Sequence, residues 1–206
     1  AGDANTGHAA SASVSTAPTA SRTFAECERV GHRVASAALA ASPAPGATHV
    51  ATARREVRLD LDVRAQDPDQ IAAWEGEAAE ADHARAALLR CWADWGRELL
   101  AVPAAPAASW TGSVTVLRWG PAVVVALPGE PFAATAQAIR AAAGPADTVL
   151  VAGYCDGCPG YLPPAPEYTH GGYEVEEAHR YYGLPGPFAA GAAERLVAAA
   201  VSLPSE

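Results

Sequence analysis

The sequence of 206 residues contains no methionine and no lysine, and arginine supplies all 14 of its basic residues. Because translation begins at methionine, we expect a processed or broken chain whose upstream part lies on another polypeptide. Residues 1–8 begin abruptly and have neither the apolar run of a signal peptide nor the composition of a tail. We therefore interpret them as the interior of a loop.

Basic residues are also fewer than acidic ones, 14 against 23, which leaves a formal net charge of −9. This balance argues against the basic stripe of a nucleic-acid-binding protein and the polybasic patch of a membrane-surface protein. No run of about 18 strongly apolar residues occurs, so we expect no transmembrane segment. The length is that of one domain, and we treat residues 1–206 as a single region.

Cysteine is scarce, and the four that occur are Cys27, Cys91, Cys155 and Cys158. The last two form a C-x-x-C motif, which allows free thiols in a loop, a disulfide, or a redox or metal site. A zinc ribbon needs a second such pair, and a thioredoxin-like motif should precede a helix, whereas this one lies in a loop. We favour free thiols, and the lack of a visible disulfide framework favours the cytoplasm.

Capping signals and hydrophobic periodicity predict the elements of the first half. They are a helix from the capping residue Thr23 to about Leu39, a strand over 57–63, and a long helical region from Pro68 to about Leu100. Trp92, Trp95 and Leu99 share one face of the last region. A stripe of this kind is typical of core packing.

The second half alternates strands and helices. We expect strands over 114–119 and 122–127 around a Gly120-Pro121 turn, an alanine-rich helix to about Ala143, a buried strand over 148–152, a loop over 153–187 and a helix over 188–201. Strands mixed with helices in this order predict an α/β or α+β fold, a mixed layered sheet with flanking helices.

Two features of this half could carry chemistry. The strand ending at Leu127 leads to Glu130 at the mouth of a turn, and the strand over 148–152 leads into the long loop. If these strands are parallel neighbours, both features emerge at the edge of the sheet where ligands prefer to bind. All six tyrosines lie in that loop, at positions 154, 161, 168, 173, 181 and 182. A phenol can donate a hydrogen bond or, when a metal removes its proton, act as an oxygen ligand.

The six histidines are scattered and form no H-x-H or H-E-x-x-H motif, so the chain contains no self-contained zinc site. His8 in the opening loop and His170 in the tyrosine loop are the better candidates to line a site. His32 and His83 lie in predicted helices and are interpreted as structural.

Several motifs together resemble the neutral/alkaline ceramidase family of zinc amidases. They are Leu127-Pro128-Gly129-Glu130, the segment from Gly153 to Tyr161, Glu167-Tyr168 and Gly172-Tyr173-Glu174. The opening residues 2–7 resemble the Gly-Asp-x-Ser-Pro-Asn loop of that family. The resemblance covers essentially the whole chain, which corresponds to the C-terminal half of the family's catalytic domain.

The resemblance implies a zinc site of which this chain carries half. Glu130 matches the family's zinc-ligating glutamate, Tyr161 its zinc-ligating tyrosine, and Tyr173 a tyrosine that helps to bind the amide or its product. The family's two zinc-ligating histidines lie upstream of the opening loop. They are therefore expected on the N-terminal half of the same protein, a separate or missing chain that would be the partner of this one.

The chain departs from the family at the catalytic serine, whose place is taken by Asn5. An asparagine amide cannot be activated as a nucleophile, but it can donate a hydrogen bond to a developing oxyanion. Hydrolysis would then use a water activated by the metal. Thr6 is the nearest hydroxyl and a weaker candidate nucleophile.

Three functions follow from these features. The first is a zinc-dependent hydrolase that cleaves the C–N bond of a small-molecule or lipid-like amide, with Glu130 and Tyr161 as metal ligands and Asn5 and Tyr173 orienting the carbonyl. The second is an inactive relative that binds an N-acyl or lipid-like ligand, which the asparagine favours. The third is a thiol protein that uses Cys155 and Cys158.

Overall fold

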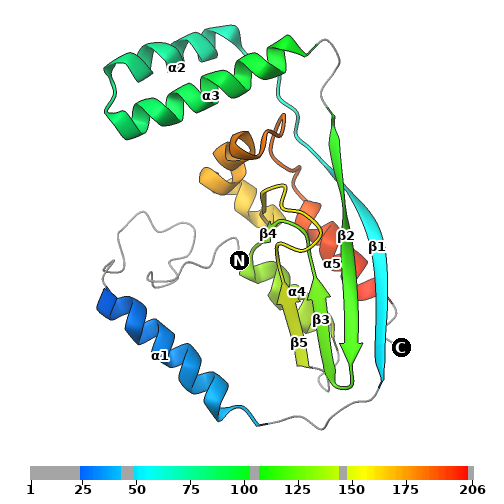
Figure 1. Ribbon diagram of the computed structural model, residues 1–206. Helices are drawn as coiled ribbons and strands as arrows, with labels where there is room; N and C mark the ends of the chain where they lie inside the picture. The colour runs from blue at the N-terminus through cyan, green and yellow to red at the C-terminus, as the bar shows by residue number, and fades with distance from the viewer. Residues whose placement is uncertain (1–23, 43–48, 103–106, 144–147, 204–206) are drawn as a thin grey trace.

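The computed structural model describes residues 24–42, 49–102, 107–143 and 148–203. Its centre is a four-stranded sheet with the order β1-β2-β3-β5 (Figure 1). The strands are β1 (Val50–Asp60), β2 (Ser109–Trp119), β3 (Ala122–Ala126) and β5 (Thr148–Ala152). The first two pairs are antiparallel, and β3 and β5 are parallel. The mixed sheet and its helices confirm the predicted fold class.

The β2–β3 hairpin turns at Gly120, whose φ of 58° is in the left-handed region that glycine adopts readily. The hairpin therefore forms where the Gly-Pro signal predicted it. Strand β5 differs from the prediction of a buried strand. It lies at the edge of the sheet, and while Val149 is buried, the side chain of Leu150 is 54% exposed.

Helices α4 (Ala133–Ala142) and α5 (Ala192–Ser202) supply the main core. Ile139 of α4 and Leu196 of α5 join the buried valines of β2, β3 and β5 in one apolar cluster. Because side chains alternate along a strand, the valines at every second position face these helices. The core thus fixes the sheet, and with it the ends of β3 and β5 from which the site is built.

Helices α2 (Pro68–Glu80) and α3 (His83–Ala101) form an antiparallel hairpin beyond one end of the sheet (Figure 1). The predicted long helical region is therefore two helices. Ala81 has extended backbone, and the Asp82 side chain accepts a hydrogen bond from the Arg85 amide at 2.9 Å, which caps α3. The predicted start of α2 is confirmed, since the Asp67 side chain accepts from the Asp69 amide.

Helix α1 (Phe24–Ala40) confirms the first predicted helix, although its capping residue Thr23 lies outside the described residues. Its Phe24 and Val34 side chains are exposed. Among the described residues, no helix combines the length and the apolar character that crossing a membrane requires.

The predicted loop over 153–187 contains short elements. They are β6 (Tyr161–Leu162), the 3-10 helices η1 (Ala165–Thr169) and η3 (Ala178–Tyr182), and the π-helical turn η2 (Tyr173–Glu177). Strand β6 pairs in parallel with the two-residue strand β4 (Glu130–Pro131). This small second sheet carries the candidate site.

Candidate functional site

The segments that follow β3 and β5 are joined by backbone hydrogen bonds. The Leu127 amide donates to the Ala152 carbonyl at 2.8 Å, and the Cys155 amide donates back to the Leu127 carbonyl at 2.9 Å. The Tyr154 amide donates to the Gly129 carbonyl at 2.8 Å. The parallel pairing of the two strands therefore brings the Pro-Gly-Glu turn and the tyrosine loop to one edge of the sheet, as the sequence predicted.

Gly129 allows the turn and the loop to approach closely. Its φ is 64°, and a β-carbon there would lie 2.6 Å from the carbonyl oxygen of Gly160. That same oxygen accepts a hydrogen bond from the Glu130 amide at 2.9 Å. Gly160 has a φ of 113°, and a β-carbon on it would meet the ring of Tyr182 at 2.9 Å. Both glycines are required for Glu130 to stand in register with Tyr161.

The Glu130 carboxylate is the centre of the site. Glu130 is 8% exposed, and its two oxygens accept hydrogen bonds from different tyrosines. The Tyr154 hydroxyl donates to Oε2 at 2.6 Å, and the Tyr182 hydroxyl donates to Oε1 at 2.7 Å. Within the described residues, the side chains that donate to this carboxylate are thus neutral phenols, and none of them supplies the cationic partner that usually accompanies a buried anion.

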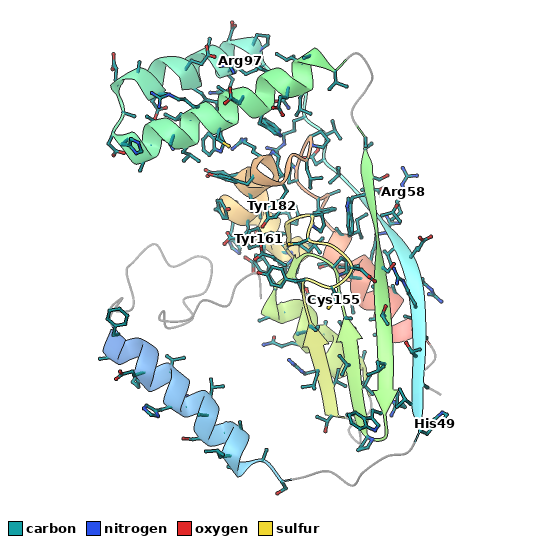
Figure 2. The ribbon with its side chains drawn as sticks, in the orientation of Figure 1. His49, Arg58, Arg97, Cys155, Tyr161 and Tyr182 are labelled. Carbon is teal, nitrogen blue, oxygen red and sulfur yellow. The ribbon has the colours of Figure 1, made fainter. Side chains whose placement is uncertain are left out.

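Further tyrosines continue the cluster away from the carboxylate. The ring of Tyr161 meets that of Tyr173 edge to face, with 5.7 Å between centroids, and Tyr173 meets Tyr181 at 5.9 Å. Tyr173 and Tyr181 are exposed, so this side of the array faces solvent. Figure 2 shows Tyr161 and Tyr182 close together near the end of the sheet, below the α2–α3 hairpin. We call Glu130 with Tyr154, Tyr161, Tyr173 and Tyr182 the tyrosine site.

The environment keeps these phenols protonated. The hydrogen bond to Glu130, with burial as a smaller cause, raises the pKa of Tyr154 to about 12. Burial first, and the neighbouring Glu130 carboxylate second, raise the pKa of Tyr161 above its ordinary value. Burial is also the first cause for Tyr182, followed by its hydrogen bond to Glu130, and it raises the pKa of Tyr173 as well. At neutral pH the four phenols are hydrogen-bond donors.

Tyr154 shows that the local backbone is strained. Its φ is 60°, in the left-handed region that residues other than glycine occupy at a cost of roughly 1–2 kcal/mol. The amide bond to Gly129 and the hydroxyl bond to Glu130 hold it there. Strain of this kind is concentrated at functional sites, where surrounding contacts enforce it.

The predicted site residues fall into three groups. Glu130 is in register with Tyr161, whose ring contacts that of Tyr173. Asn5 and the alternative candidate His8 lie outside the described residues. His170 is exposed at the end of η1.

Tyr154 and Tyr182 were not among the predicted site residues. The concentration of all tyrosines in one loop was the available signal, but it does not show which of them turn toward Glu130. Tyr182 is 52 positions from Glu130 in the sequence, and only the folding of η3 brings it back.

The donor set partly fits a zinc ion. A carboxylate offers about four lone-pair directions, so Glu130 can accept two hydrogen bonds and still bind a metal. A phenol next to it is a further oxygen donor. Among the residues that the structure describes, however, no group of three His, Cys, Asp or Glu could hold a metal. The nitrogen ligands that zinc prefers would have to come from outside this part of the chain.

The C-x-x-C cysteines do not form a disulfide. Cys155 and Cys158 are free, and the Cys155 thiol donates to the Gly153 carbonyl at 3.4 Å. This arrangement agrees with the prediction of free thiols in a loop.

Comparison with protein-family models and with curated protein sequences gave no match for this chain.

Proposed function

We propose that the tyrosine site is one half of the metal site of a zinc-dependent hydrolase that cleaves the C–N bond of a linear amide. The observation that carries the proposal is the buried Glu130 carboxylate, aligned with Tyr161 across β4 and β6 and contacted by neutral phenols. The two-histidine partner half that the resemblance implies would complete the coordination.

Charge is the main physical argument. Taking a carboxylate out of water is costly unless a cation or several hydrogen bonds compensate it. Glu130 has two hydrogen bonds from phenols and lies where the loops after two parallel strands meet. A divalent cation at Glu130 would supply the missing charge and would also favour loss of the Tyr161 proton, which the site by itself disfavours.

Within this proposal the residues have separate tasks. Glu130 and Tyr161 hold zinc, which when bound polarises a carbonyl and lowers the pKa of a bound water. Tyr173, exposed and protonated at neutral pH, donates a hydrogen bond to the amide oxygen or to the product. Asn5 would add a second donor to that oxygen, a task its amide can perform although it cannot act as a nucleophile.

Native mass spectrometry with the metal retained tests the proposal first. We expect a complex of this 21.0 kDa chain with a second polypeptide and one zinc ion. In that complex, Glu130→Ala should abolish zinc binding and the hydrolysis of N-acyl substrates. Glu98→Ala, which changes an exposed glutamate of α3, should leave both unchanged.

The outcomes separate the candidate functions. A Glu130→Ala protein that is fully zinc-loaded and active would refute the assignment. A complex that binds zinc and an N-acyl ligand but turns over no substrate would support the inactive relative, which the replacement of serine by Asn5 favours. Loss of function in Cys155→Ser with Glu130→Ala unaffected would instead support the thiol protein.

A further inference from the structure

Arg180 of η3 is enclosed by three tryptophans of the α2–α3 hairpin. Its guanidinium carbon lies 4.6 Å from the ring centroid of Trp92, 5.3 Å from that of Trp74 and 5.6 Å from that of Trp95. Trp74 and Trp92 also meet edge to face at 5.6 Å, so the rings support one another. A cation over several aromatic faces is attracted by each, and more strongly where water is excluded. We call Trp74, Trp92 and Trp95 the tryptophan cage.

A second set of contacts attaches the same segment to α3. The ring of His179, 7% exposed, meets that of Trp95 edge to face at 5.4 Å. The Trp95 indole donates to the Leu184 carbonyl at 3.0 Å, and the Leu184 amide donates to the His179 carbonyl at 3.1 Å. Apart from its internal packing, the hairpin makes its main element-to-element contact with η3.

The next two residues of η3 face the tyrosine site. Tyr181 meets Tyr173, and the Tyr182 hydroxyl donates to Glu130. Four consecutive residues thus contact two different parts of the molecule. His179 and Arg180 contact the α2–α3 hairpin, and Tyr181 and Tyr182 contact the tyrosine site. A 3-10 helix has poorer hydrogen-bond geometry than an α-helix and is used only in short pieces, so external contacts must fix its orientation.

We propose that Arg180 is a positioning residue, through which the α2–α3 hairpin sets the placement of Tyr182 on the Glu130 carboxylate and so the geometry of the metal site. The metal part of this inference rests on the proposed function, whereas the placement of Tyr182 does not. The hairpin would then fix the position of η3 next to the site. This role accounts for the three tryptophans that surround one arginine far from the main core.

Arg85 provides a matched control. Its guanidinium carbon lies 5.6 Å from the same Trp92 ring, but Arg85 belongs to α3 and pairs with Glu77 at 3.0 Å. Arg85→Met therefore removes a cation from the cage without touching η3. Arg180→Met removes the cation that joins the cage to η3, and Arg180→Lys keeps the charge but loses the planar stacking surface.

Two measured properties, the state of Tyr182 and the zinc affinity, should differ from wild type in Arg180→Met and equal wild type in Arg85→Met. The NMR signals of the Tyr182 ring should shift in Arg180→Met, because the hydrogen bond from its hydroxyl to Glu130 is weakened, and should keep their wild-type positions in Arg85→Met. Tyrosine NMR, with Tyr182 assigned from Tyr182→Phe, measures this. Zinc affinity of the two-chain complex should fall roughly tenfold, the usual cost of losing support behind a metal ligand. Both measurements for Arg180→Lys should lie between those of the wild type and those of Arg180→Met.

Far-ultraviolet circular dichroism identifies the variants that fold, and Arg180→Lys supplies the test if Arg180→Met does not fold. A folded Arg180 variant with wild-type Tyr182 NMR signals and wild-type zinc affinity would overturn the inference. If the wild-type complex binds no zinc, the proposed function fails, but the Tyr182 readout still decides whether Arg180 positions it.

Discussion

Replacing Gly129 by alanine tests the close approach on which the site depends. The residue has a φ of 64°, and the new β-carbon would lie 2.6 Å from the Gly160 carbonyl oxygen, inside any normal contact. Left-handed backbone costs alanine roughly 1–2 kcal/mol. Relief of the overlap by movement of the packed segments adds about 1–3 kcal/mol. We therefore expect a loss of about 2–5 kcal/mol in the free energy of unfolding.

Gly183→Ala separates the two costs. Gly183 has a φ of 66°, almost the same as Gly129, but a β-carbon there would have no atom within 4 Å. It should therefore lose only the roughly 1–2 kcal/mol of backbone strain. Urea unfolding followed by circular dichroism and tryptophan fluorescence measures both variants, with the midpoints compared at equal m-values.

The overlap also predicts a local effect. The Gly160 oxygen accepts from the Glu130 amide, so pushing the two segments apart should separate β4 from β6 and weaken any metal binding at Glu130. Gly183→Ala should leave that binding intact. If Gly129→Ala loses no more stability than Gly183→Ala and keeps the site, the reasoning about close approach is refuted.

Two further predictions concern buried polar groups. Tyr182→Phe removes a hydrogen bond to a charged, buried carboxylate and should lower the free energy of unfolding by about 1.5–3 kcal/mol. Tyr168→Phe removes a hydrogen bond to the neutral Phe188 carbonyl and should lower it by only about 0.5–1.5 kcal/mol. Equal losses for the two variants in denaturant titrations would contradict this view of Glu130. Burial, with Arg180 and Arg64 as further causes, lowers the pKa of His179 from 6.5 to about 4. Between these pH values the unfolded chain therefore binds a proton that the folded chain does not. The free energy of unfolding should then fall by roughly 3 kcal/mol as the pH drops from 6.5 to 4. His179→Phe keeps a ring against Trp95 and should flatten that part of the pH dependence, and an unchanged slope would show that His179 is not its source.

Sequence patterns predicted the local elements well, because each depends on residues close together in the chain. The Gly120 turn, the Asp67 cap and the apolar alternation of the strands act within a few positions. They were sufficient for the fold class and for the expectation that Glu130 and the tyrosine loop share one edge. The helical region predicted over 68–100 is helical in the structure, but the sequence reading did not find the break at Asp82, a helix cap within an otherwise continuous helical composition.

What only the tertiary structure decided is which distant residues meet. Nothing local shows that Tyr182 turns back to Glu130, or that Arg180 enters a cage of tryptophans from two other helices. Tyrosine and arginine are compatible with many surroundings, and their partners here are tens of residues away. Hydrophobic periodicity reports which face of an element is buried, whereas the pairing of one hydroxyl with one carboxylate depends on the packing of the whole domain.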